Sequence, residues 1–216
     1  MTRFTKITAS IGPNCETRDV LTDMIKSGVN VCRINFSHDT GNVQGAKIDL
    51  IRSISAELNI PVAIMIDIQG PKHRIGAFET EKHYPLKVGQ KFVLDSDPTP
   101  GNEYRVNLPD SDVMKSLNVG DRVLLNDGKI ELKVDAVFDD KIETTVVRGD
   151  EIWSRRGFNL PDTDVDTEIL TTKDKADLEY AITKNPDYVA LSFVQRAEDV
   201  AFVRDFINAR DRKSVV

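Results

Sequence analysis

The first 70 residues alternate between short apolar runs and longer stretches whose apolar residues recur at helical spacing. Continuous apolar runs are typical of parallel strands covered on both faces, and apolar residues three and four apart are typical of amphipathic helices. Short links between such segments indicate right-handed strand–helix–strand crossovers. The expected strands are Arg3–Ile11, Val29–Phe36 and Pro61–Ile68, and the expected helices are Glu16–Ser27, closed by Gly28, and Asn42–Leu58.

The pattern changes after Gly70-Pro71. From Gly76 to Arg155 the helical periodicity largely disappears, and short strands alternate with turn sequences. This pattern predicts a small β-barrel or β-sandwich inserted into the first fold. The expected strands are Lys91–Leu94, Arg122–Leu125, Ile130–Val134 and Ile142–Val147, with hairpin-type turns at Val88–Gln90, Val119–Asp121 and Asn126–Gly128.

The helix–strand alternation returns after Arg156-Gly157. We expect a helix over Thr171–Thr183, a strand over Asp187–Val194 and a helix over Ala197–Ala209. Four parallel strands result, which fit either half of an eight-stranded barrel or a small doubly wound sheet. The sequence contains neither a GxGxxG motif nor a P-loop, so the usual nucleotide-binding signatures are absent.

Composition narrows the class of protein. The 216 residues are 40% hydrophobic and 30% charged, with a formal net charge of −6. An acidic balance argues against a general nucleic-acid coat, and two cysteines cannot make a disulfide framework. No apolar run reaches the length of a membrane span, and the N-terminus lacks a signal peptide. We therefore expect a cytoplasmic protein without a membrane partner.

Polar side chains gather where the expected strands end. Arg33, Asn35 and Ser37 alternate with apolar residues and should therefore share one face of their strand. Taken singly, each could be a surface or turn residue. Ligands of parallel α/β proteins bind beyond the carboxyl ends of the strands, so the joint placement favours an anionic, phosphorylated ligand. The other members of this set are Asp67, Lys72, Arg74 and Ser192.

Six motifs occur in the order in which the pyruvate kinase family has them, and through them the whole chain resembles that family. One of them is Arg33-Ile-Asn-Phe-Ser-His38, which closely resembles the family's second-strand motif. The other five are Thr5-Lys-Ile with Ile11-Gly-Pro13, Asp67-Ile-Gln-Gly-Pro-Lys-His-Arg74, Leu125-Asn-Asp-Gly-Lys-Ile130, Gly157-Phe-Asn-Leu-Pro161 and Ser192-Phe193.

The resemblance implies an α/β fold, half of a (β/α)8 TIM barrel interrupted by an all-β barrel lid domain. The first part of the barrel domain would span residues 1–72, the lid 73–157 and the second part of the barrel 158–216, stopping before the fifth strand. The implied reaction is the glycolytic transfer of a phosphoryl group from phosphoenolpyruvate to ADP. The complete enzyme would be a homotetramer.

The resemblance also assigns roles to individual residues. Arg33 would contact the substrate phosphate, and Asp127 would lie in the lid motif that faces the cleft. Arg156 stands where many members have lysine, which keeps the charge but not the geometry. The implied nucleotide contacts are Asn35, Phe36, Ser37, His38, Arg74 and Arg156; the implied ligands of a monovalent cation are Asn35, Ser37, Asp67 and the backbone of Ile68.

Cofactor expectations follow from the same comparison. Members that need potassium carry an acidic residue where this chain has Lys72, whose ammonium group could replace the ion. We therefore expect activity without potassium. The catalytic lysine and the ligands of Mg²⁺ or Mn²⁺ would lie in a Lys-Ile-Glu strand and beyond, after the end of the chain, so the chain alone should be inactive. The strings Lys129–Glu131 and Lys141–Glu143 fall inside the β insert and are expected to be ordinary strand residues.

Two other functions stay open. One is a non-catalytic protein that keeps the phosphate and nucleotide cleft. The other is an oligonucleotide-binding β module, for which residues 76–155 are a poor fit. They hold 16 acidic and 11 basic residues, a net charge of −5, with few aromatics, whereas single-strand binders need a basic groove with stacking platforms.

Overall fold

The computed structural model describes residues 4–163, 165 and 167–210. The chain divides into two compact units. Unit 1 comprises Met1–Pro71 and Glu168–Val216, and unit 2 comprises Lys72–Thr167. The second division lies ten residues after the expected 157/158 boundary, because residues that follow Gly157 pair with a strand of unit 2. The first division lies one residue before the expected one.

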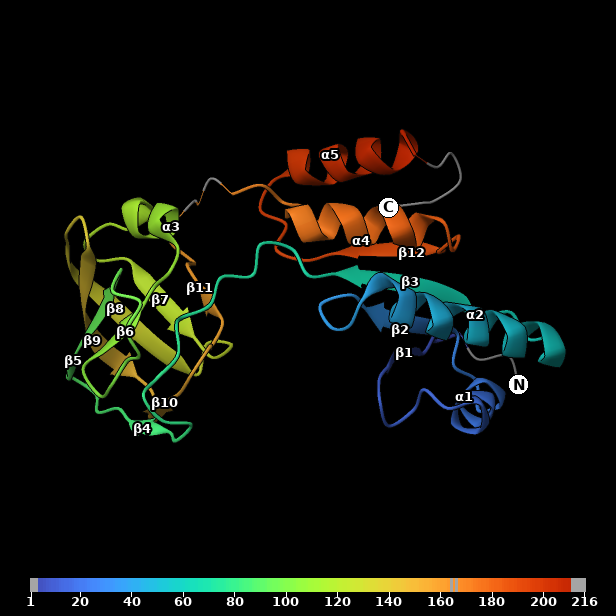
Figure 1. Ribbon diagram of the computed structural model, residues 1–216, viewed down its shortest axis with the longest axis horizontal. Coiled ribbons are helices and arrows are strands. Elements are labelled where there is room, and N and C mark those ends of the chain that lie inside the picture. Colours follow the sequence, from blue (N-terminus) through green and yellow to red (C-terminus); the bar gives the residue numbers. More distant parts are fainter. Residues whose placement is uncertain (1–3, 164, 166, 211–216) are drawn as a thin grey trace. The chain divides into compact units, whose positions relative to one another are not determined.

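Unit 1 is a parallel four-stranded sheet with helices on one face (Figure 1). The strand order is β1-β2-β3-β12, and every neighbouring pair is parallel. The elements are β1 (Thr8–Ile11), α1 (Arg18–Lys26), β2 (Val31–Asn35), α2 (Gly41–Leu58), β3 (Ala63–Ile68), α4 (Thr172–Ile182), β12 (Tyr188–Leu191) and α5 (Ala197–Asn208).

Buried and half-buried residues alternate strictly along β2 and β3, which shows which face of the sheet packs against the helices. In β2 and β3 every second residue is buried among the apolar side chains of the helices, as Ile34 and Ile66 are. The residues between them, including Arg33 and Asp67, are half-buried and point to the opposite face. The helix packing therefore determines which face carries the polar side chains.

Local sequence signals explain where the helices begin and end. Gly28 follows α1 with φ of 100° and donates its N–H to Ile25 O, as expected for a glycine after a helix. Thr171 caps α4 in a capping box with Asp174, which is fully buried. Asp174 also accepts a hydrogen bond from the Gly70 N–H at 3.2 Å, so it joins the start of α4 to the end of the β3 segment.

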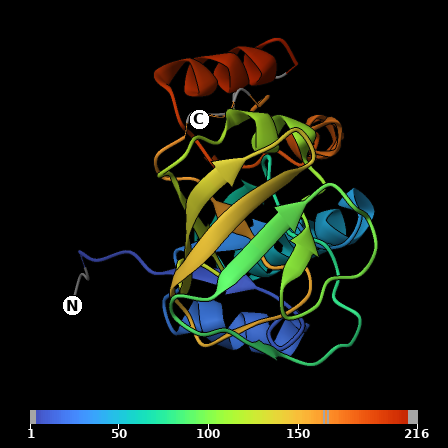
Figure 2. The ribbon, with the colours of Figure 1, turned by 90° about the vertical axis from the view of Figure 1, so that its left-hand side faces the viewer.

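Unit 2 is built on a six-stranded, mostly antiparallel sheet in the order β11-β7-β8-β9-β5-β6, and it faces the viewer in Figure 2. It has its own apolar core, separate from that of unit 1. The elements are β4 (Tyr84–Pro85), β5 (Lys91–Asp95), β6 (Arg105–Asn107), α3 (Ser111–Ser116), β7 (Arg122–Leu125), β8 (Ile130–Val137), β9 (Lys141–Arg148), β10 (Glu151–Ile152) and β11 (Phe158–Asn159).

The insert is not entirely β, since α3 interrupts it. Asp110 caps this helix and accepts hydrogen bonds from the N–H groups of Asp112 and Val113. A six-residue helix is too short to show a period, which explains why the sequence pattern missed it. The two Lys-Ile-Glu strings lie in the β hairpin as expected, with all residues in strands except Lys129, which belongs to the turn before β8. Glu131 of β8 pairs with Arg148, and Glu143 of β9 pairs with Lys141.

Candidate functional site

Arg33 is the central cation at the carboxyl ends of the unit 1 strands. Its Nε donates to Asp67 Oδ2 at 2.8 Å and its Nη1 to Ser10 Oγ at 2.7 Å, while Nη2 also contacts Asp67. Ser192 Oγ, after β12, lies 3.2 Å from the second oxygen of Asp67. Four strands thus contribute to one polar cluster, which comprises Ser10, Arg33, Asp67 and Ser192.

Asp67 and Ser10 orient Arg33 without engaging all of its N–H donors. A guanidinium group has five N–H donors, and the described residues engage three of the five. The two remaining N–H groups belong to Nη1 and Nη2, the atoms that form a fork suited to phosphate oxygens. The Arg33 side chain is 33% exposed and that of Asp67 14% exposed, so a small anion can reach the arginine while Asp67 holds it.

The loop after β2 is fixed through its backbone. Asn35 Oδ1 accepts a hydrogen bond from the Ser37 N–H at 2.9 Å, forming a tight turn. Buried Gln44 donates to the carbonyl oxygens of Asn35 and His38 at 2.9 and 2.8 Å. Lys173 Nζ donates to the Phe36 carbonyl at 2.7 Å. The peptide groups of residues 35–38 are therefore preorganised, whereas the His38 side chain is exposed.

The residues expected to bind a monovalent cation have suitable chemistry. Asn35 and Asp67 are opposite one another in the β2–β3 register, and Ile68 ends β3. Amide, hydroxyl, carboxylate and carbonyl oxygens are ligands for a hard cation. The Asp67 charge is already balanced by Arg33, so a bound cation would share that carboxylate. For a divalent metal, the described ranges contain no group of three His, Cys, Asp or Glu side chains placed to hold one.

Three of the expected residues of unit 2 meet around Gly157. Arg74 forms an antiparallel bridge with Gly157, and its side chain donates to the Arg155 carbonyl at 2.9 Å. Arg156 directly precedes Gly157. The Asn126 N–H donates to the Gly157 carbonyl at 3.0 Å, which brings the turn with exposed Asp127 to the same segment.

Lys72 and Arg74 line an open pocket of about 480 Å³ with His73, Pro109, Asp110 and Ser111. Within it, His73 Nδ1 lies 2.6 Å from Asp110 Oδ2. The Lys72 side chain is exposed. Lys72 and Arg74 thus line a solvent-accessible hollow and are available to an anionic ligand.

Several residues that build the site were not predicted from the sequence. Ser10 could have been found, because it alternates with buried Ile11 at the end of its strand. Gln44, Lys173 and Asp174 act across elements distant in sequence, and no local signal distinguishes them from helix-surface residues.

Fold and site together define an α/β protein with a parallel sheet that presents a guanidinium at the carboxyl ends of its strands. A family profile, "Pyruvate kinase, barrel domain", matches residues 2–216. The chain is 41% identical to a pyruvate kinase of Methylorubrum extorquens, over 94% of this chain and 42% of that protein. It is 37% identical to a pyruvate kinase of Thermotoga maritima, over 98% of this chain and 45% of that one.

A solved structure gives the same result. The crystal structure of a pyruvate kinase from Cryptosporidium parvum superposes with a TM-score of 0.86 at 33% identity, over 95% of this chain and 42% of that one. The chain belongs to the pyruvate kinase family. It spans about two-fifths of the length of these relatives. The expected family and the expected partial TIM-barrel fold are both confirmed. Among the described residues, no helix is long and apolar enough to cross a membrane.

Proposed function

We propose that this chain supplies the substrate-phosphate and nucleotide-binding part of a pyruvate kinase of the cytoplasm. In the reaction, the bond between phosphorus and the enol oxygen of phosphoenolpyruvate breaks. A bond from phosphorus to a terminal oxygen of ADP forms, and the enolate takes up a proton to give pyruvate. The observation that supports this most is Arg33, oriented by Asp67 and Ser10, with two N–H groups that no other described residue engages.

The proposed roles follow from charge and placement. Phosphoryl transfer depends mainly on positioning and on neutralising charge spread over the phosphoryl oxygens. Arg33 would bind the phosphate of phosphoenolpyruvate, and Arg74 and Arg156 those of the nucleotide. The fixed backbone of residues 35–38 would contribute further nucleotide contacts. A bound divalent ion would add charge neutralisation, and the described residues contain no group of three His, Cys, Asp or Glu side chains placed to hold it.

The chain on its own is proposed to be inactive. Both of its Lys-Ile-Glu strings lie in β8 and β9 of unit 2 or directly before them, with their glutamates already paired. We therefore assign the catalytic lysine to the part of the relatives that this chain does not match. The complete protein, proposed to be a homotetramer, would be the active form.

A chimera tests this function. The matching part of the Methylorubrum extorquens enzyme is replaced by this chain, and pyruvate formation is followed with a coupled dehydrogenase. The chimera should turn over phosphoenolpyruvate and ADP, and the chain alone should not. Arg33→Ala should lower kcat/KM for phosphoenolpyruvate by about 100-fold or more. Arg33→Lys, which keeps the charge beside Asp67, should lose less.

Arg18→Ala is the matched control, because Arg18 pairs with Glu57 on the exposed surface of unit 1. It should leave kcat/KM unchanged. A folded chimera that binds phosphoenolpyruvate without turnover would instead indicate a non-catalytic phosphate-binding protein. Equal rates for Arg33→Ala and Arg18→Ala would refute the role of Arg33.

Potassium dependence is proposed separately. With Lys72 in place of an acidic residue, the chimera should keep its rate when tetramethylammonium replaces potassium. Lys72→Glu should create a potassium requirement, because it removes the fixed positive charge. A strong requirement in the unsubstituted chimera would contradict this assignment.

A further inference from the structure

Trp153 is the single tryptophan of the sequence and lies in an aromatic stack in unit 2. The His83 ring is stacked on it, with centroids 4.2 Å apart and planes 9° apart. The Arg156 guanidinium carbon lies 4.8 Å from the centre of the Trp153 ring. The β4–β10 pairing, which joins Tyr84 to Ile152, places the preceding His83 opposite the following Trp153.

The partners of Arg156 leave its charge uncompensated. Its Nε donates to the Ser154 carbonyl at 3.1 Å, and in the described part of the chain no carboxylate pairs with its guanidinium. An aromatic face and a carbonyl oxygen attract a guanidinium without neutralising it. Arg156 is therefore held in place while its Nη groups stay available to an anion.

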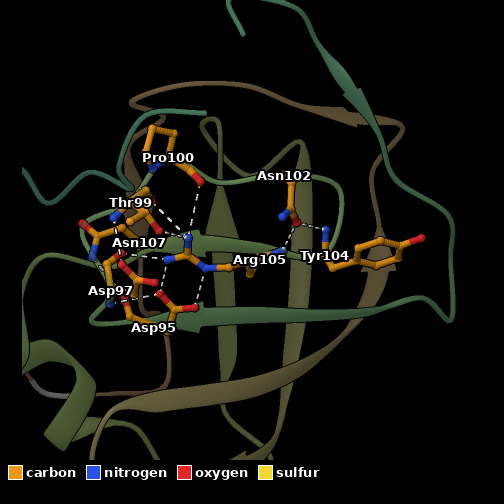
Figure 3. Close-up of polar contacts among 8 residues, drawn as sticks. All are labelled: Asp95, Asp97, Thr99, Pro100, Asn102, Tyr104, Arg105 and Asn107. Atoms are coloured by element: carbon orange, nitrogen blue, oxygen red, sulfur yellow. Dashed lines mark hydrogen bonds and ion pairs between the residues drawn. The ribbon is translucent and has the colours of Figure 1, made fainter. Parts of the chain in front are cut away.

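Arg105 of the same unit shows the opposite arrangement (Figure 3). Its guanidinium pairs with Asp95 and donates to oxygens of Asp97, Thr99 and Pro100. Its N–H groups donate to Asp95 at the end of β5 and to the loop between β5 and β6, and Asp95 balances its charge. The contrast indicates that Arg105 stabilises a loop, whereas Arg156 is available for a ligand.

Further contacts hold both His83 and Arg156 against Trp153. His83 Nδ1 lies 2.8 Å from Glu151 Oε1, which fixes the plane of the imidazole that packs on Trp153. The backbone of Arg156 is fixed as well, because its carbonyl accepts the Ile75 N–H at 3.0 Å. The Arg156 side chain is thus anchored at its backbone and at its guanidinium, beside the separate segment that carries Arg74.

We propose that Trp153 is a positioning residue that holds the Arg156 guanidinium ready for the phosphate groups of a nucleoside diphosphate. The inference rests on the proposed function, since that function supplies the nucleotide. Long side chains lose rotamer freedom when they bind, and a guanidinium ordered in advance loses less of it. Trp153 thereby strengthens binding without touching the ligand.

The chimera described above provides the kinetic test. Trp153→Leu should raise KM for ADP by about three- to tenfold, the loss expected for one cation–π contact. KM for phosphoenolpyruvate, which depends on Arg33 of unit 1, should not change. Trp153→Phe keeps a ring and should recover most of the affinity for ADP. Phe138→Leu is the matched control, because it removes a similar contact, with Lys141 at 4.7 Å, and should leave both KM values unchanged.

The results of these experiments distinguish a failure of the positioning role of Trp153 from a failure of the proposed function. If Arg156→Gln leaves KM for ADP unchanged, or the chimera is inactive and the chain binds no ADP, the proposed function fails at this site. If Arg156→Gln raises KM for ADP and Trp153→Leu does not, the positioning role alone is overturned. A loss that affects both substrates equally would mean that Trp153 is merely structural.

A direct measurement on the 216-residue chain needs no turnover. The Arg156 Nε–H signal in a nitrogen-15 spectrum, assigned by its loss in Arg156→Gln, should be shifted by the ring current of Trp153. Trp153→Leu should return it towards the position of a solvent-exposed arginine, and Phe138→Leu should not. An unshifted Arg156 signal in the parent chain would overturn the proposal.

Discussion

The role of each arginine in this protein depends on what balances its charge. Arg105 is 18% exposed and surrounded by a carboxylate and carbonyls, so it belongs to the structure of a loop. Arg33 shares its charge with Asp67 but keeps two donors. Arg156 is held by an aromatic ring and one carbonyl. Only the last two arrangements leave hydrogen-bond donors for a phosphate, which is why residue type alone cannot assign the function.

The two cysteines should react differently. Burial, and to a smaller extent the neighbouring Cys15, raises the pKa of the Cys32 thiol to about 11. The thiolate is the reactive form, so a raised pKa leaves less of it at neutral pH. At pH 8, iodoacetamide should modify half-exposed Cys15 and spare Cys32, which is 1% exposed. Peptide mass spectrometry measures both sites.

Labelling of the folded Cys15→Ser variant should then be negligible and should appear only when urea unfolds unit 1. Equal labelling of the two cysteines in the native chain would show that β2 is far less protected than its burial indicates.

The polar face of the sheet could be predicted, but its contacts could not. The alternation of Arg33 and Asn35 with apolar residues correctly places both on one face. That Arg33 pairs with Asp67, 34 positions away, follows from the β2–β3 register, which one sequence does not specify. His38 shows most clearly that a sequence does not reveal whether a residue contributes through its backbone or its side chain. Its carbonyl is bound by Gln44 while its side chain is exposed, so its contribution to the site described here is through the backbone.

At the scale of elements, two glycines decide how α2 and α4 pack. The ring of Tyr180 in α4 lies against Gly41 and Gly45 of α2, where a Cβ added to Gly45 would come within 2.9 Å of the Tyr180 ring atom Cε1. In a free helix, Gly→Ala stabilises by about 1 kcal/mol. Here Gly45→Ala should instead destabilise unit 1 by about 1–2 kcal/mol, because the ring must move.

The sign of this effect should reverse when the ring is removed. In a Tyr180→Ala background, Gly45→Ala should stabilise, since only helix propensity remains. Urea unfolding of the four chains gives the free energies of unfolding for the cycle. Destabilisation by Gly45→Ala in both backgrounds would show that another neighbour limits the space.

Element length decided which parts of the fold could be predicted. The helices of 9 to 18 residues show enough turns for their periodicity to be read. The strands β4, β10 and β11 have two residues each, which is too short for an alternating pattern to be recognised. β11 matters most, because its pairing with β7 carries the chain after Gly157 into unit 2. A segment expected to resume the barrel therefore completes the β insert.

At the scale of the whole molecule, unit 2 has the properties of an independent folding unit. It has a core of its own, and its incoming and outgoing segments pair through Arg74 and Gly157. Beyond Gly157, buried Phe158 joins that core and Asp162 pairs with Arg122. A fragment of residues 72–167 should therefore fold alone, with a single cooperative transition in urea followed by circular dichroism.

A fragment ending at the boundary expected from sequence, residues 73–157, is the informative comparison. It lacks Phe158, which is 4% exposed in the structure, and removal of a buried phenylalanine costs about 3–5 kcal/mol. It also lacks β11, so the N–H and C=O groups of β7 that pair with β11 become exposed. The shorter fragment should be unfolded or markedly less stable, and Phe158→Ala in the longer fragment should reproduce most of that loss. Equal stability of the two fragments would mean that residues 158–167 only lie against unit 2, and that the barrel part of the chain begins where the sequence pattern placed it.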